Sequence, residues 1–160
     1  MLPFEGGHLL GADHLGRDIL SRLLWGTRLS LMVGMAAALI AATVGSLIGI
    51  FAGFYGGRLD MMLMRSIDVL MAFPYILLAL AIVAVLGPGL MNALIAVAVV
   101  NIPFFARNVR GATLAIVQSD FIAAARLSGR NTLSLLLFEL LPNLVSVIIV
   151  AFSTTVGWMI

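Results

Sequence analysis

The sequence predicts an all-α fold, a polytopic bundle of about four transmembrane helices formed by a single domain over residues 1–160. Hydrophobic residues make up 62% of the chain and charged residues only 10%, whereas a soluble domain carries roughly 25% charged residues. Several uncharged stretches also reach the roughly 20 residues needed to cross a bilayer. These stretches lack the alternation of barrel strands, and an isolated segment in hydrocarbon must satisfy its own backbone as a helix.

The positions of the charged residues divide the chain into spans. Between Arg28 and Arg58 lie 29 uncharged residues, enough for one helix. Between Asp68 and Arg107 lie 38 uncharged residues, too many for one helix, and the turn-forming sequence Gly87-Pro88-Gly89 divides them. No charge follows Glu139. The predicted spans are therefore 29–54, 67–86, 90–107 and 141–160.

Arginine placement predicts the orientation of these spans. The segment 107–140 carries four arginines, which places it in the cytoplasm by the positive-inside rule. Parity then places the turn at 86–92 outside, the loop 55–65 inside and residues 1–28 outside. The stretch 17–28 predicts an amphipathic helix on the membrane surface, with Asp18 as its N-terminal cap.

Composition excludes several classes of function. The chain has no cysteine, so it offers neither disulfides nor thiolate metal ligands, and no lysine, so it holds neither a Walker phosphate-binding loop nor a Schiff base. Its scattered arginines do not form a nucleic-acid surface. His8 and His14 are too few for a metal site. An intramembrane enzyme is also disfavoured, because no serine–histidine or aspartate pair falls within the spans. We therefore expect no catalytic residue, metal or cofactor in this chain.

Three glycines spaced four apart, Gly45, Gly49 and Gly53, lie on one face of the first span. Small residues at this spacing allow another helix to approach closely, so these are predicted helix-packing residues. The partner helix belongs either to another subunit or to this same chain, and the spacing favours neither.

Two prolines and two acidic residues invite functional and structural interpretations. Pro74 and Pro103 lie in apolar runs, where each can kink a helix and line a pathway, although such prolines are also common without any role. Asp68 and Glu139 flank spans, which favours pairing with nearby arginines over proton relay.

The segment Asp120–Gly129 is the most informative stretch outside the spans. Asp120 is a candidate cap for a short helix and Gly129 a candidate terminator. Between them lie three alanines and Arg126, a smooth surface with one polar contact. Such a surface suggests docking into a groove of a partner, the alternative being a solvated connector.

Three motifs in order resemble a known family. HLLGADHLGRDILSRLLWGTRLSL resembles H-x-L-G-T-D-x-x-G-R-D-x-x-S-R-x-x-x-G-x-R-x-S-L, and AGFYGGRLDMMLMRSIDVLMAFPYILLALA resembles a G-x-x-G-G-x-x-D stretch followed by D-x-x-x-A-F-P. FIAAARLSG followed by LLPN resembles an E-A-A-x-x-x-G loop and a downstream L-P-N. Together they resemble the inner-membrane permease subunit of ABC importers, in the dipeptide, oligopeptide and nickel branch known as the C-type permease.

This resemblance implies a function, a location and partners. The chain would form half of a solute pathway, and this branch of the family implies that the solutes are peptides. It would lie in a bacterial or archaeal inner membrane, surrounded by lipid. Its partners would be a second permease subunit, cytoplasmic ATPase subunits and an extracytoplasmic solute-binding protein. The region 113–140 would carry a coupling helix that docks on the ATPase. The implied coupling residues are Asp120, Phe121, Ala123, Ala124, Ala125, Arg126 and Gly129.

The sequence departs from the family pattern at two residues and in length. Ala123 stands where the family has glutamate, which, with Asp120 as cap, would complete a capping box. Glu139 stands where a histidine is often found. The family also has a further span before the His8 region and another after Ile160, which makes a transport-inactive fragment the alternative to a working permease.

Overall fold

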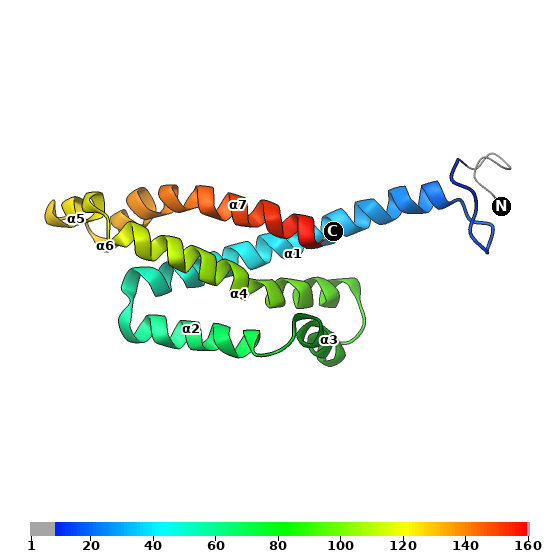
Figure 1. Cartoon of the computed structure of the whole chain (residues 1–160), viewed down its shortest axis with the longest axis horizontal. Helices are drawn as coiled ribbons and strands as arrows, with labels where there is room; N and C mark the ends of the chain where they lie inside the picture. Colours follow the sequence, from blue (N-terminus) through cyan, green and yellow to red (C-terminus); the bar gives the residue numbers. More distant parts are fainter. Residues whose placement is uncertain (1–8, 160) are drawn as a thin grey trace.

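The computed structural model describes residues 9–159, and in this range the chain is a bundle of helices (Figure 1). Residues 1–8 and Ile160, at the ends of the predicted extracytoplasmic segment and last span, lie outside the described part. The elements, in order, are α1 (Ile19–Tyr55), α2 (Gly57–Met71), α3 (Tyr75–Leu86), α4 (Leu90–Val117), α5 (Asp120–Leu127), α6 (Thr132–Ser134), the π-helix η1 (Leu135–Leu140) and α7 (Leu141–Met159). The prediction of an all-α bundle is confirmed.

Helix α1 is one continuous helix of 37 residues. Asp18 caps its start, as its carboxylate accepts a hydrogen bond from the Ser21 N–H at 2.9 Å. The amphipathic stretch 17–28 is thus not a separate surface helix, because it continues directly into the first span. At 1.5 Å per residue α1 is about 55 Å long, well beyond the roughly 30 Å hydrocarbon core. Its N-terminal part projects away from the bundle (Figure 1).

The face of α1 that carries Gly45, Gly49 and Gly53 packs on α4. A β-carbon added at any of the three would come within 2.6 to 2.7 Å of an α4 atom, closer than side chains approach. Of the two partners that the sequence left open, the structure places one within this chain. Two clusters of buried side chains continue this packing toward α7. They are Ala41, Ala42, Phe105 and Ala151, and Ile50, Val109, Leu140 and Leu144.

The segment predicted as one span over 67–86 is broken in the structure. Helices α2 and α3 meet at an angle of 90°. Pro74 takes the N-cap position of α3, because proline disfavours helical backbone in the residue before it and lacks the N–H that a continuing helix would use. The predicted polar loop 55–65 is also different, since most of it forms the first turns of α2.

Helix α4 and the C-terminal helix extend beyond their predicted ends. The span predicted over 90–107 continues to Val117, because Arg107 and Arg110 find carboxylate partners on α2 and need not lie in a loop. The last helical stretch starts at Thr132, before the predicted Leu141. By length and apolarity three helices could cross a membrane, or four if the bent α2–α3 pair counts as one span.

The π-helix precedes Pro142 of the L-P-N sequence. Proline has no N–H to give to the helix, and widened turns occur where the regular ladder is interrupted. The Asn143 side chain bonds back into this turn, donating to the Glu139 carbonyl at 2.6 Å. The motif therefore has a local structural role at the entry to α7.

Candidate functional site

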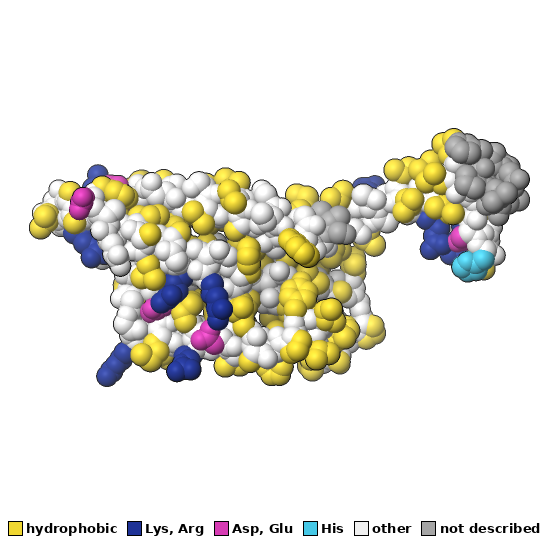
Figure 2. Space-filling view, in the orientation of Figure 1, with side chains coloured by type: hydrophobic (Ala, Val, Ile, Leu, Met, Phe, Trp, Pro, Cys, Tyr) yellow, Lys and Arg dark blue, Asp and Glu magenta, His cyan; other side chains and the backbone are white. Residues whose placement is uncertain are grey.

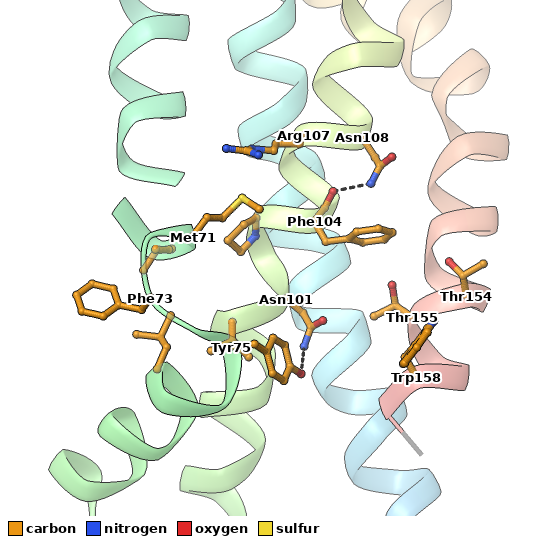
Figure 3. A pocket seen from close by; sticks show the side chains of 14 residues that line it. Met71, Phe73, Tyr75, Asn101, Phe104, Arg107, Asn108, Thr154, Thr155 and Trp158 are labelled. Atoms are coloured by element: carbon orange, nitrogen blue, oxygen red, sulfur yellow. Dashed lines mark hydrogen bonds between the residues drawn. The ribbon is translucent and has the colours of Figure 1, made fainter. Parts of the chain in front are cut away.

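A cavity of about 620 Å³ lies between the α2–α3 bend, α4 and α7 (Figure 3). Three separate parts of the chain supply its walls. The labelled lining residues are Met71, Phe73 and Tyr75 from the bend, Asn101, Phe104, Arg107 and Asn108 from α4, and Thr154, Thr155 and Trp158 from α7. The cavity combines apolar rings with amide, hydroxyl and guanidinium groups, as binding cavities generally do.

Asn101 and Tyr75 form the polar contact that crosses the cavity wall. The Asn101 amide donates to the Tyr75 hydroxyl at 2.8 Å and to the Val97 carbonyl at 2.8 Å. The tyrosine hydroxyl keeps its own proton for another acceptor. This bond ties the start of α3 to the middle of α4 (Figure 3).

The remaining polar side chains of the cavity bond mainly to their own helices. Asn108 donates to the Phe104 carbonyl at 2.8 Å. Thr154 and Thr155 donate to the Ala151 carbonyl at 2.9 Å and 2.7 Å. These groups keep acceptor capacity on the amide and hydroxyl oxygens. They can therefore contact a solute without first breaking a bond between helices.

Both prolines singled out in the sequence lie at this cavity. Pro103 lines it from within α4, which remains one helix on either side. Pro74 lies between two lining residues, Phe73 and Tyr75, and sets the bend that brings the Tyr75 side chain to Asn101 (Figure 3). The sequence reasoning missed Tyr75, Thr154 and Thr155. Polar side chains in otherwise apolar spans were the available signal, because such groups usually face the bundle interior.

Two ion pairs connect α4 to α2 beside the cavity. Arg110 binds the Asp60 carboxylate with two hydrogen bonds, at 2.5 Å and 2.6 Å. Arg107, which lines the cavity, binds Asp68 at 2.5 Å. Asp68 is therefore paired structurally, the interpretation that the sequence favoured over a proton relay.

The helix α5, which contains the predicted coupling residues, buries one side chain. Ile122 is fully buried, while Phe121, Ala123 and Ala124 are exposed and Ala125 is half-buried. The helix ends in a Schellman motif around Gly129 (φ +78°), in which the Gly129 and Arg130 N–H groups donate back into the last turn. The helix therefore ends at a defined residue and presents small alanine side chains on its exposed surface.

The start of α5 differs from the prediction. Ser119, and not Asp120, occupies the N-cap position, so Asp120 is the first helical residue. Ala123 is then the fourth residue of the helix, and a glutamate there would not complete a capping box, which needs the third position. That third position is the buried Ile122. The replacement of glutamate by Ala123 therefore removes no capping interaction.

Two arginines bind α5 and its C-terminal loop to the rest of the chain. The Arg126 guanidinium lies over the Phe54 ring, 5.6 Å from its centre, at the end of α1. Arg130 forms an ion pair with Glu139 of the π-helix. Glu139 is thus paired with an arginine, as the sequence favoured.

Several large apolar side chains near α5 are exposed, although this end of the bundle is the charged end. Leu127 is 90% exposed and Phe138 is 70% exposed. Phe121 and Leu133 are exposed as well, and we call these four apolar residues of α5, α6 and the π-helix the α5 patch. Exposed apolar groups gathered in this way mark interaction sites.

Residues 9–18 of the first family motif form a compact turn before α1. The Asp13 carboxylate accepts hydrogen bonds from the N–H groups of Leu15 and Arg17 at 2.8 Å and 2.9 Å, and from Arg22 at 2.5 Å. The bond from the Arg17 N–H is the largest cause of a lowered Asp13 pKa. Gly16 has φ +74°, a conformation that favours glycine.

No group of three or more potential metal ligands occurs among residues 9–159. His14 belongs to the turn before α1, and His8 lies outside the described residues. The structure therefore adds no metal or cofactor candidate to those considered from the sequence.

Comparison with known proteins identifies the family. Residues 45–160 match the family described as "Binding-protein-dependent transport system inner membrane component". The chain is 48% identical over 153 residues to the glutathione transport system permease protein GsiD of Pectobacterium atrosepticum, covering 96% of this chain and 51% of that protein. It is 46% identical over 149 residues to the di/tripeptide transport system permease protein DppC of Pseudomonas aeruginosa, covering 91% and 49%. The chain thus spans about half the length of these relatives.

A solved structure supports the fold. A chain of the MetNI methionine ABC transporter, in an inward-facing conformation, matches with a TM-score of 0.71 at 22% identity, over 85% of this chain and 70% of that one. At this identity the match establishes the fold. The resemblance to C-type permeases seen in the sequence is confirmed by the relatives, and the family is one of transport components rather than enzymes. The chain belongs to the inner-membrane components of binding-protein-dependent transport systems.

Proposed function

We propose that this chain is a membrane-spanning subunit of an ATP-driven importer of short peptides and forms half of its translocation pathway. The observation that carries the proposal is the cavity between the α2–α3 bend, α4 and α7. It lies along α4 from Val100 to Asn108, and polar side chains that face a space among membrane helices commonly mark a solute pathway. A second permease subunit would complete the pathway on the open side.

The chemistry of the cavity suits a peptide. Peptides carry amide donors and acceptors along the backbone and a carboxylate at one end. Asn101, Tyr75 and the two threonines offer hydrogen-bonding groups of the same kind. Arg107 is paired with Asp68, but its guanidinium has further N–H groups that can donate to the carboxylate. The relatives named for glutathione and for di- and tripeptides support the same solute class.

Energy for transport would come from separate ATPase subunits in the cytoplasm. This chain has no lysine for a Walker phosphate-binding loop. We infer that the α5 patch and the exposed alanines dock on the ATPase, with Asp120, Phe121, Ala123, Ala124, Ala125, Arg126 and Gly129 as the coupling residues. Because Arg126 contacts Phe54 and Arg130 contacts Glu139, movement of α5 would be passed to both α1 and the entry of α7.

The proposed setting is a bacterial inner membrane. The turn before α1 and the turn between α3 and α4 would face outward, where a solute-binding protein delivers peptide. The α5 patch would face the cytoplasm. Because the chain has no cysteine, a single Ser128→Cys variant tests this orientation in sealed vesicles. Labelling of the exposed Ser128 site from the inner face supports the orientation, and labelling from the outer face alone refutes it.

Blocking the cavity tests the transport proposal. Thr154→Trp places a large ring in the cavity, and it should abolish uptake of a labelled tripeptide by the chain reconstituted with its partner subunits. Ser153→Trp is the matched control, because Ser153 is the neighbouring exposed residue and does not line the cavity. Equal uptake by the two variants would remove the cavity from the pathway.

Bulk on α5 tests the docking proposal. Ala124→Trp should prevent co-purification of the ATPase subunit while leaving membrane insertion intact, because a ring cannot enter a groove shaped for alanine. Ala84→Trp is the control at an exposed alanine of α3, at the other end of the bundle. If the unsubstituted chain inserts but captures no ATPase, the chain is an inserted component without transport activity.

A further inference from the structure

The charged side chains of α2 and α4 form a narrow layer across one end of the bundle. In Figure 2 blue and magenta side chains gather there, while the bundle toward α3 shows only yellow and white. Asp60 and Asp68 are each bound by an arginine of α4. Arg65 lies between these aspartates in the sequence and is exposed, and it has no ion pair or hydrogen bond among the described residues. Arg65 is therefore a cation of this layer that no carboxylate among the described residues neutralises.

Arg65 borders a cavity of about 310 Å³ at the seam between α2 and α4. The same cavity is lined by Asp60, Asp68 and Arg110. Together with the neighbouring Arg107, these side chains carry three positive and two negative charges, and both carboxylates are already bound by arginines. The site therefore has a net positive charge located on Arg65.

The layer lies at the depth expected for lipid headgroups. The stretch of α4 from Leu90 to Ala106 carries no charge and is about 26 Å long at 1.5 Å per residue. Together with the preceding turn it matches a hydrocarbon core of roughly 30 Å. Arg107 follows immediately, and its pair with Asp68 brings α2 to the same depth. Arg65 is one helical turn from Asp68, on the side away from the hydrocarbon.

Apolar side chains flank the same cation. Met64 lines the seam cavity beside Arg65, and so does Met61, which is 64% exposed. Met62 is 71% exposed. A free anion gains nothing from methionine side chains, whereas an acyl chain packs against them. The combination of an unpaired arginine, a seam cavity and exposed methionines fits a lipid whose headgroup is anionic.

We propose that the α2–α4 seam binds the phosphate of an anionic phospholipid, with Arg65 as its cationic contact and the methionines of α2 against the acyl chain. Basic pockets between membrane helices on the cytoplasmic side bind such headgroups. A bound lipid would neutralise Arg65 and cover the outer side of the two ion pairs that fix α2 to α4. The proposal depends on the membrane placement of the chain, and it is independent of the solute.

Lipid selectivity measured on the purified chain in nanodiscs tests the proposal. Spin-labelled phosphatidylglycerol should be retained over spin-labelled phosphatidylcholine by about fivefold, the factor expected for one arginine near an anionic surface. Arg65→Gln should remove this preference and Arg65→Lys should keep most of it. Arg65 forms no ion pair or hydrogen bond with any of residues 9–159, so neither variant should affect folding, which circular dichroism checks.

Arg58→Gln is the matched control, because it removes the same charge from an exposed position of α2 that does not border the cavity. Retention of the preference in this variant supports a local site. An equal loss in both variants would reduce the effect to net charge and overturn the proposal. Displacement of the labelled lipid by millimolar inorganic phosphate would also overturn it, because the site would then recognise phosphate without the acyl chains.

Discussion

The seam between α1 and α4 and the helix α3 are built in opposite ways. In the seam, glycines bring two helix backbones so close that no β-carbon fits at Gly45, Gly49 or Gly53. Helix α3 has no buried residue at all, and Leu77 and Leu80 are each 60% exposed. Both regions are strongly apolar, so hydrophobicity does not distinguish them. The difference is packing.

The α1–α4 seam is a rigid scaffold, whereas helix α3 is a part of the bundle that can move. Helices in lipid are held by close packing and by hydrogen bonds between helices, since lipid tails are as apolar as leucine. By that measure the α1–α4 seam is the rigid part. Helix α3 is fixed at its start by the Tyr75–Asn101 hydrogen bond and at its end by Asn92, which donates to the Leu86 carbonyl at 2.9 Å. The side of the cavity formed by the bend is therefore the side best able to move.

The largest expected effect comes from breaking the seam. Gly49→Leu forces a side chain against the Ala106 carbonyl, 2.6 Å from the β-carbon position, and should lower the free energy of unfolding by about 3 kcal/mol. Unfolding in mixed micelles, followed by circular dichroism, measures it. Gly26→Leu on the same helix has no atom within 4 Å of the added β-carbon and should change stability far less. Equal losses would show that the seam is not the tight contact.

A smaller effect should follow from unpairing the charge that fixes α2. Arg110→Gln leaves the Asp60 carboxylate, only 17% exposed, without its two charged donors, at a cost of about 2 kcal/mol. Arg107→Gln on the same helix breaks a pair whose members are 49% and 50% exposed, and should cost less than about 1 kcal/mol. The same unfolding measurement compares them. The reverse order would mean that burial does not set the strength of these pairs.

Removal of the Tyr75 hydroxyl tests whether the start of α3 can move independently of the α1–α4 seam. Tyr75→Phe deletes the acceptor of the Asn101 hydrogen bond, worth about 1 kcal/mol, so backbone amides at the start of α3 should exchange with deuterium about fivefold faster. Mass spectrometry of peptides from α3 and from the seam measures both regions at once. Faster exchange in both would contradict an independent α3, and unchanged exchange in α3 would remove the hydrogen bond as its anchor.

The smallest expected effect lies in the turn before α1. The Arg17 N–H stabilises the ionised Asp13 carboxylate and lowers its pKa below the ordinary 3.8. A depressed pKa means that the turn is stabilised above pH 3.8 and loses this contribution as the pH falls through the native value. The Leu15 and Arg17 amide resonances should therefore shift with a midpoint below 3.8. Asp13→Asn should abolish the shift, and a midpoint at or above 3.8 would contradict the hydrogen-bond explanation.

Local chemistry made much of the molecule predictable. The turn at Gly87-Pro88-Gly89 and the end of α5 at Gly129 follow from residues that favour turns wherever they occur. The aspartate that starts α1 was predicted because its cap interaction spans only three residues. The N-cap of α5 was wrong by one residue, since both Ser119 and Asp120 suit that position and the burial of Ile122 selects the register.

Charge spacing and helical periodicity are local properties, so they sufficed to predict that the chain is helical, apolar and multi-spanning, and which face of α1 is smooth. Only the folded chain shows that this face packs on α4 of the same chain, that α2 and α3 meet at 90° and that Tyr75 contacts Asn101. Folding also brings Thr154 and Thr155 to the cavity from the last helix. These outcomes depend on which distant surfaces fit together, and a periodic pattern marks a surface without naming its partner.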